Sequence, residues 1–197
     1  MADNKVTFGL KNVHLWEMTD DGTAVSYGDV IPWKGATEIS LDPAGDRTDD
    51  YADDSLWYSI DNNQGFTGKL TFKMAPYEVT SVIVGDFKDE NGVIAQSLYQ
   101  GKPVAMAFEF QGDKKATRHI LYNVQFSRPG EGSSTKSDKL ETGNLEFDFT
   151  AGLDPYLEVA KSKSSLDTTQ EAFDAWYEKP YRVTKNAFGG STTPPAG

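Results

Sequence analysis

The chain has 197 residues, with 19 basic against 30 acidic side chains, a formal net charge of −11 and no cysteine. The lack of thiols excludes disulfides, thiolate zinc sites and cysteine nucleophiles. Because a groove that grips phosphates needs clustered Lys and Arg, the acidic balance argues against tight nucleic-acid binding. The length suits one domain, or one domain with appendages.

The N-terminal run MADNKVTFGL has no apolar core of the kind found in a secretory signal peptide. The most apolar segments are far shorter than a membrane span, and Glu109 interrupts one of them. We therefore expect a soluble protein made without export.

The first predicted strand covers residues 5–10, where apolar and polar side chains alternate. The apolar positions change phase between Leu10 and Val13, which predicts a β-bulge near Lys11 and Asn12. An Asp-Gly pair in residues 20–23 is typical of a tight hairpin turn.

The middle of the chain continues the alternation in residues 69–74, 104–110 and 120–126. Between the first two of these, residues 76–85 have apolar side chains at helical spacing, with Pro76 early and Gly85 as the expected end. Two hairpin connections are also predicted, an Asn-Gly turn in residues 89–92 and a longer one in residues 111–117.

The C-terminal third holds a further alternating segment, residues 144–150, after a Ser-, Gly- and Lys-rich run that predicts a mobile loop at 131–139. Thr168 and Glu171 have the spacing of a capping box and predict the start of a second helix, which Pro180 ends. The apolar residues of this helix share one face: Phe173, Trp176 and Tyr177.

The five alternating segments together predict a mainly β fold, an antiparallel sheet with a sandwich or barrel core, accompanied by one or two α-helices. We expect the folded domain to occupy residues 1–180. Residues 181–197 should form a flexible C-terminal tail, because the closing run FGGSTTPPAG cannot bury apolar surface.

The sequence offers little for catalysis or metal binding. Its two histidines, His14 and His119, lie in separate strand patterns, where a lone histidine is usually half buried. The HExxH, GxSxG, P-loop and GxGxxG motifs are all absent from the sequence. We therefore expect neither an enzyme nor a cofactor or metal site.

Residues 41–58, LDPAGDRTDDYADDSLWY, hold six aspartates within thirteen residues. A calcium loop needs oxygen ligands at regular spacing and a distal Glu, and this stretch has neither. A glycoside hydrolase would use two carboxylates as acid and base, with Trp57 and Tyr58 as a stacking platform, but such pairs normally come from different strands of a cleft. The plainest interpretation is a solvated loop kept soluble by its charge.

A loop of that kind does not account for the apolar bulk beside the charges. Aromatics flanked by charges are typical of an arm that anchors in a neighbouring subunit while the charges stay at the rim. We therefore predict a long acidic arm around residues 42–58. The candidate inter-subunit contacts are Asp46, Tyr51, Asp53, Asp54, Trp57 and Tyr58.

Short fragments follow one another along the chain in the order NKVTFGLKNVH, LDPAGD, YADD, Gly65-Phe66, DENGVI, FEFQGDKKATRHILYNVQFSRP and a final WY. This ordered series resembles the major tail proteins, the tail-tube subunits, of long-tailed phages with non-contractile tails. These fragments cover about residues 4–178, and the likeness lies in their order more than in any one of them.

The resemblance implies a β-sandwich or barrel-like tail-tube fold whose copies close into six-membered rings that stack into a tube. It implies as partners other copies of the chain, a tape-measure protein, tail terminator and distal tail proteins, and genomic DNA that passes through the lumen without specific binding. It places the protein in the virion tail, and in the host cytoplasm during assembly. The competing hypothesis is a monomeric β-sandwich carbohydrate-binding module or glycoside hydrolase that uses the acidic and aromatic loop; oligomeric state separates the two.

Overall fold

The structure is a computed structural model that describes residues 4–96, 98, 100–130 and 143–183. The predicted loop at 131–139 and most of the predicted C-terminal tail lie outside these residues. No helix in the described ranges has the length and apolar character needed to cross a membrane.

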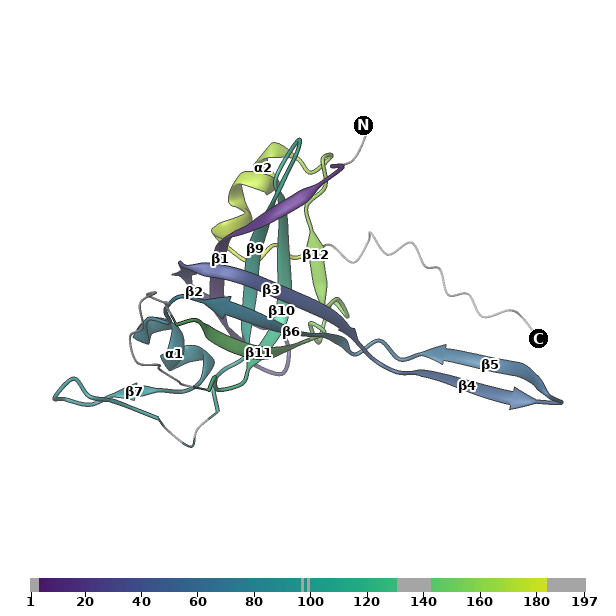
Figure 1. Ribbon diagram of the computed structural model, residues 1–197, viewed down its shortest axis with the longest axis horizontal. Coiled ribbons are helices and arrows are strands. Elements are labelled where there is room, and N and C mark those ends of the chain that lie inside the picture. The colour runs from purple at the N-terminus through teal and green to yellow at the C-terminus, as the bar shows by residue number, and fades with distance from the viewer. Residues whose placement is uncertain (1–3, 97, 99, 131–142, 184–197) are drawn as a thin grey trace, which may run out of the picture.

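An eight-stranded antiparallel sheet forms the body of the molecule, in the order β2-β1-β9-β10-β11-β6-β3, with β12 paired to β10 (Figure 1). The prediction of a mainly β fold with one or two helices is confirmed. The strands of this sheet are β1 (Thr7–Asp20), β2 (Val25–Trp33), β3 (Ala36–Ala44), β6 (Gly65–Phe72), β9 (Val104–Gly112), β10 (Thr117–Phe126), β11 (Leu145–Gly152) and β12 (Lys161–Lys163).

Alternation along the strands supplies the main core, because each strand turns every second side chain to the same side. Trp33 lies at the centre of this core: its ring stacks on Phe72 at a centroid distance of 3.6 Å and meets Phe147 edge-on at 5.1 Å. The helix α1 (Tyr77–Ile83) packs Val79 and Ile83 into the same cluster. It begins after Pro76 and is followed by Gly85, at a φ of 74°, as the sequence predicts.

A second apolar cluster lies on the other face of β9. Ala105 and Ala107 lie in it, so this strand is buried on both sides. A short helix α2 (Gln170–Asp174) and a 3₁₀ turn η1 (Ala175–Tyr177) bring Trp176 onto these small residues. The predicted capping residue was wrong by one position: Thr169 accepts the hydrogen bond from the Ala172 amide.

The turns and the bulge agree with the sequence. The register between β1 and β9 shifts between Lys11 and His14, and Asn12 has a φ of 55°, which confirms the predicted bulge. The Asp-Gly turn joins β1 to β2, and the Asn-Gly turn joins β7 (Phe87–Lys88) to β8 (Ile94–Ala95).

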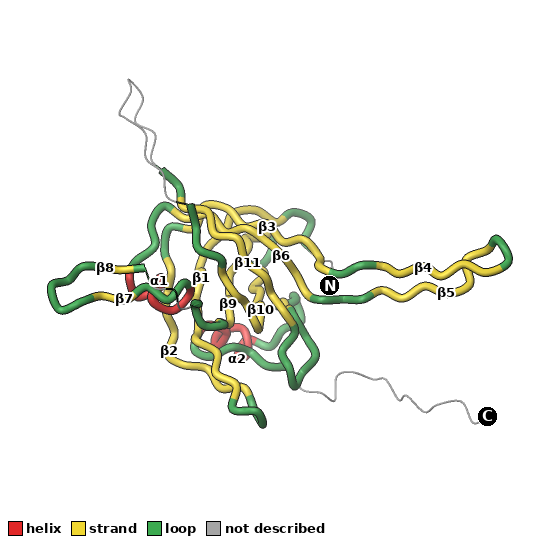
Figure 2. The backbone as a smooth tube through the Cα atoms, turned by 90° about the horizontal axis from the view of Figure 1, so that it is seen from below, coloured by secondary structure: helices red, strands yellow, loops and turns green. Residues whose placement is uncertain are grey.

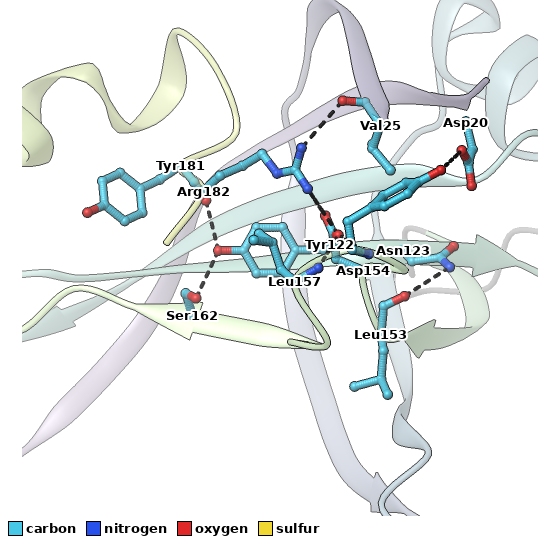
Figure 3. Close-up of polar contacts among 11 residues, drawn as sticks. Asp20, Val25, Tyr122, Asn123, Leu153, Asp154, Leu157, Ser162, Tyr181 and Arg182 are labelled. Carbon is cyan, nitrogen blue, oxygen red and sulfur yellow. Dashed lines mark hydrogen bonds and ion pairs between the residues drawn. The ribbon is translucent and has the colours of Figure 1, made fainter. Parts of the chain in front are cut away.

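The body of the protein extends beyond the predicted boundary at residue 180. The carboxylate of Asp154, which is fully buried, accepts two hydrogen bonds from Arg182 at 3.0 and 2.8 Å (Figure 3). The Tyr122 hydroxyl donates to the carbonyl of Tyr181, whose ring stacks on Trp176. Any flexible tail therefore begins after Arg182, because these contacts hold the two residues that follow Pro180.

Candidate assembly arm

The acidic stretch forms a β-hairpin that projects from the body (Figures 1 and 2). Its strands β4 (Arg47–Ala52) and β5 (Ser55–Asp61) pair with each other and, within the described ranges, with no other strand, so they make a sheet of their own. The hairpin connects β3 to β6, two neighbouring strands of the main sheet. We call residues 45–64 the arm. The predicted arm covered residues 42–58, so the observed one begins about three residues later and ends about six residues later.

The root of the arm continues the pairing of β3 with β6. The Gln64 amide donates to the Ala44 carbonyl at 2.9 Å, and the Asn62 amide donates to the Asp46 carbonyl at 3.0 Å. Gly45 allows this close approach: it has a φ of 138°, and a Cβ there would lie 1.8 Å from the carbonyl oxygen of Asn62. The backbone of the arm is therefore joined to the sheet by hydrogen bonds, unlike a free loop.

Asp53 and Asp54 form the tip of the arm. Their φ angles are 50° and 56°, and two positive φ values in a two-residue connection are typical of a type I′ turn. Such turns usually contain Asn-Gly, since most side chains avoid this region. The tip thus carries two adjacent charges at positions where Asn and Gly are more usual.

The register of the arm distributes its aromatics over both faces. Tyr51 pairs with Leu56, and Asp50 pairs with Tyr58, one position away and therefore on the opposite face. Trp57 is the extra residue at the irregularity between these pairs. A partner that covered only one face would leave apolar side chains exposed on the other.

The exposure of these side chains is high for their size. Tyr51 is 67% exposed, Trp57 71%, Tyr58 58% and Leu56 49%. Exposed apolar side chains gathered on one projection mark an interaction surface more often than scattered ones do. The sequence prediction placed Tyr51, Trp57 and Tyr58 together on an arm, and the structure brings them together there.

Polar contacts organise the base of the arm. Asp49 accepts from Ser59 Oγ at 2.6 Å and from Arg47 Nε at 2.9 Å. The hydrogen bond from Ser59, followed by that from Arg47, holds the pKa of the Asp49 carboxyl below its usual value. These contacts hold Arg47 and Asp49 against Ser59 within the hairpin. All the charged side chains Arg47, Asp49, Asp50, Asp53 and Asp54 are exposed.

The geometry of the arm gives less support to the two alternatives, glycoside hydrolysis and metal binding. Asp53 and Asp54 are neighbours in a turn, whereas a glycosidase needs carboxylates that face each other across a cleft. Among the residues that the structure places, no group of three or more His, Asp or Glu side chains is arranged to hold a metal ion. His14 packs against Tyr177 with ring centroids 4.6 Å apart, and His119 stacks on Phe108 at 5.1 Å.

A second apolar projection was not foreseen from the sequence. The β7–β8 hairpin exposes Phe87, Val93 and Ile94 by half or more, and it lies at the opposite end of the molecule from the arm (Figures 1 and 2). Its Asn-Gly turn predicted a hairpin but gave no sign of exposure, because short apolar runs look the same in sequence whether buried or exposed.

Comparison with known proteins identifies no family for this chain. No protein-family model matches the sequence, and no curated protein matches it significantly.

Proposed function

We propose that this protein is a structural virion protein, the subunit of a phage tail tube, which self-assembles through its arm into stacked six-membered rings. The observation that carries the proposal is the arm itself: a projecting hairpin with Tyr51, Trp57 and Tyr58 exposed at its end. The ordered likeness to tail-tube subunits in the sequence supplies the identity of the assembly.

The energetics of the arm support an interface role. An isolated two-stranded hairpin is at best marginally stable in water, and these aromatics gain nothing from the core of their own monomer. Tyr and Trp are enriched among the residues that dominate protein interfaces, where loss of one commonly costs about 2 kcal/mol or more. Packing against neighbouring copies would give the arm the burial that the monomer withholds.

The charge of the chain supports the conduit role. A channel that conducts DNA must not bind its phosphates, and a protein with a net charge of −11 meets that condition. In this proposal the protein has a structural role and no enzymatic one. Its partners are other copies of itself, a tape-measure protein, and terminator and distal tail proteins. It resides in the virion tail and, during assembly, in the host cytoplasm.

Light scattering on the purified protein over a range of concentrations and salts tests the proposal. Growth of mass with concentration, to rings or longer polymers, is the expected result. A protein that stays monomeric throughout, and also fails to polymerise on an added tail-tip complex, would contradict the proposal and would favour the monomeric carbohydrate-binding alternative.

A further inference from the structure

The short strand β12 presents two lysines on one face. In its pairing with β10, Lys161 lies opposite Leu121 and Lys163 lies opposite His119. Ser162, between them, points to the other side, where its hydroxyl lies 2.8 Å from the Tyr122 hydroxyl and donates to it, since the single Tyr122 proton goes to the Tyr181 carbonyl (Figure 3). Two positive charges therefore stand side by side on the face that carries His119.

These two charges have no counter-ion within the described part of the chain. The lysines Lys69 and Lys102, by contrast, are paired with carboxylates. Lys161 lies 5.3 Å from the ring of Phe66, a contact that leaves its charge unneutralised. Burial and then the charge of Lys163 lower the pKa of Lys161, as expected where cations crowd together.

A cavity of about 450 Å³ opens beside Lys163. Phe110, Thr117 and His119 are among the residues that line it. His119 is 7% exposed, and its buried Nδ1 has no hydrogen-bond partner among the residues that the structure describes. The cavity therefore combines an aromatic wall with polar groups and an adjacent positive charge. A partner with both carboxylates and aromatics suits that combination.

We propose that this surface, the basic face of β12 formed by Lys161, Lys163 and the cavity beside His119, receives the acidic arm of a second copy of the chain. The inference rests on the self-assembly proposed above and names the surface at which it occurs. Charge complementarity selects the occupant: the arm brings Asp50, Asp53 and Asp54 together with exposed aromatics.

The direction of the arm supports contact in trans. It extends away from the sheet, so its tip lies far from the body that carries it (Figures 1 and 2). A contact between the arm of one copy and the β12 face of the next joins two different surfaces. Such a heterologous contact propagates from copy to copy, and it generates a ring where the rotation closes and a filament where it does not.

A second pair of neighbouring lysines, Lys114 and Lys115, suits the arm less well. Lys115 lies over the ring of Phe173 at 4.1 Å, and Asp113 precedes Lys114 in the chain. A carboxylate neighbour and an occupied aromatic face weaken the attraction for an acidic partner.

Charge reversal tests the inference. The double variant Lys161→Glu/Lys163→Glu should need at least a tenfold higher protein concentration to assemble, as measured by light scattering. Circular dichroism should show an intact sheet. Adding Asp50→Lys and Asp53→Lys to that chain should restore assembly, because the charges are then exchanged between the two surfaces. The matched control, Lys34→Glu/Lys179→Glu, makes the same change in net charge at exposed sites elsewhere and should assemble normally.

Cross-linking gives a second readout, since the chain contains no cysteine. An equimolar mixture of Asp50→Cys and Lys163→Cys proteins should yield a disulfide-linked dimer of the two variants under mild oxidation. If wild-type protein assembles and Trp57→Ala does not, but the β12 reversal assembles normally and no mixed dimer forms, the β12 inference is wrong and the tube proposal stands. If wild-type protein never assembles, both are wrong.

Discussion

His119 is an imidazole held against the rings of Phe108 and Phe110. Burial, and then the charges of Lys161 and Lys163, lower its pKa from 6.5 to about 4. Between these values the unfolded chain binds a proton that the folded chain does not. The contribution of His119 to the free energy of unfolding is therefore fully present above pH 6.5. It is lost as the pH drops toward 4, which lowers the free energy of unfolding by up to roughly 3 kcal/mol.

We accordingly predict that the free energy of unfolding of an assembly-deficient monomer falls between pH 7 and pH 5, and that His119→Phe reduces the fall. Phenylalanine keeps the aromatic packing and cannot take up the proton. Urea unfolding at the two pH values, for both proteins, measures the effect. An equal loss of stability in the two proteins would show that carboxylates elsewhere cause it.

Asp154 and Arg182 form the other residue-scale feature with a measurable consequence. The Asp154 side chain is completely buried, and besides Arg182 it accepts hydrogen bonds from the Tyr156 and Leu157 amides. We predict that Arg182→Ala destabilises the fold by about 3 kcal/mol, because it leaves a buried carboxylate without its cation. Chemical denaturation measures this loss.

A matched control comes from the arm. Arg47→Ala removes an exposed partner of Asp49 and should cost the fold less than about 1 kcal/mol. Asp154→Asn combined with Arg182→Ala should recover part of the stability that Arg182→Ala loses. Equal effects of the two single arginine substitutions would mean that the Asp154 pair is no more important than a surface ion pair.

The arm is the element on which assembly depends in this account. Trp57→Ala and, separately, Tyr51→Ala should abolish or strongly weaken assembly, since each removes an interface anchor worth about 2 kcal/mol or more that repeats in every subunit. The sheet should remain, because neither side chain belongs to the core. Circular dichroism and light scattering on each variant measure the two effects; unfolded protein, or normal assembly of both variants, would contradict this role.

The root of the arm gives a second element-scale prediction. Gly45→Ala places a methyl group where the Asn62 carbonyl lies, at a φ that side chains rarely adopt. The hairpin must then separate from the extension of β3 and β6. We expect assembly to weaken while the body stays folded. Gly22→Ala is the control: it also has a positive φ, but no atom lies within 4 Å of the added methyl group and the site is remote from the arm. Equal assembly defects in both would point to strain in general.

The sequence predicted the strands whose apolar and polar side chains alternate. It did not predict strands with an interrupted pattern or strands that form only through pairing with a neighbouring strand. The alternating segments in β6 and β11 were identifiable because one face of each packs in the core. β9 and β10 are buried on both faces, so their alternation indicated only part of their burial. β2 was not identifiable, since Gly28, Asp29 and Pro32 interrupt its pattern. β12 is only three residues long and exists because β10 pairs with it.

The candidate site shows the same limit. Aromatics among aspartates predicted an arm, yet aspartate is depleted in strands and Asp-Asp is an uncommon hairpin turn, so the hairpin itself was not predicted. Asp154 and Arg182 are 28 residues apart, and no local pattern connects them. The basic face of β12 likewise depends on a tertiary pairing that brings Lys163 beside His119.

At the scale of the whole molecule, the arm and the β7–β8 hairpin project from opposite ends of the sheet, and both carry exposed apolar side chains (Figure 2). That shape suits a subunit that contacts neighbours on more than one side. The chain as a whole is strongly acidic. Because like charges repel, we expect assembly to depend on salt: moderate salt should screen the overall repulsion, and high salt should weaken the contact of the arm with the β12 face.

Negative-stain electron microscopy of the purified wild-type protein tests the central claim most directly. The account predicts rings of uniform diameter or hollow tubes built from them, with Trp57→Ala protein imaged alongside showing only small particles. Wild-type fields that contain only monomer-sized particles, at high concentration and after addition of a tail-tip complex, would contradict it.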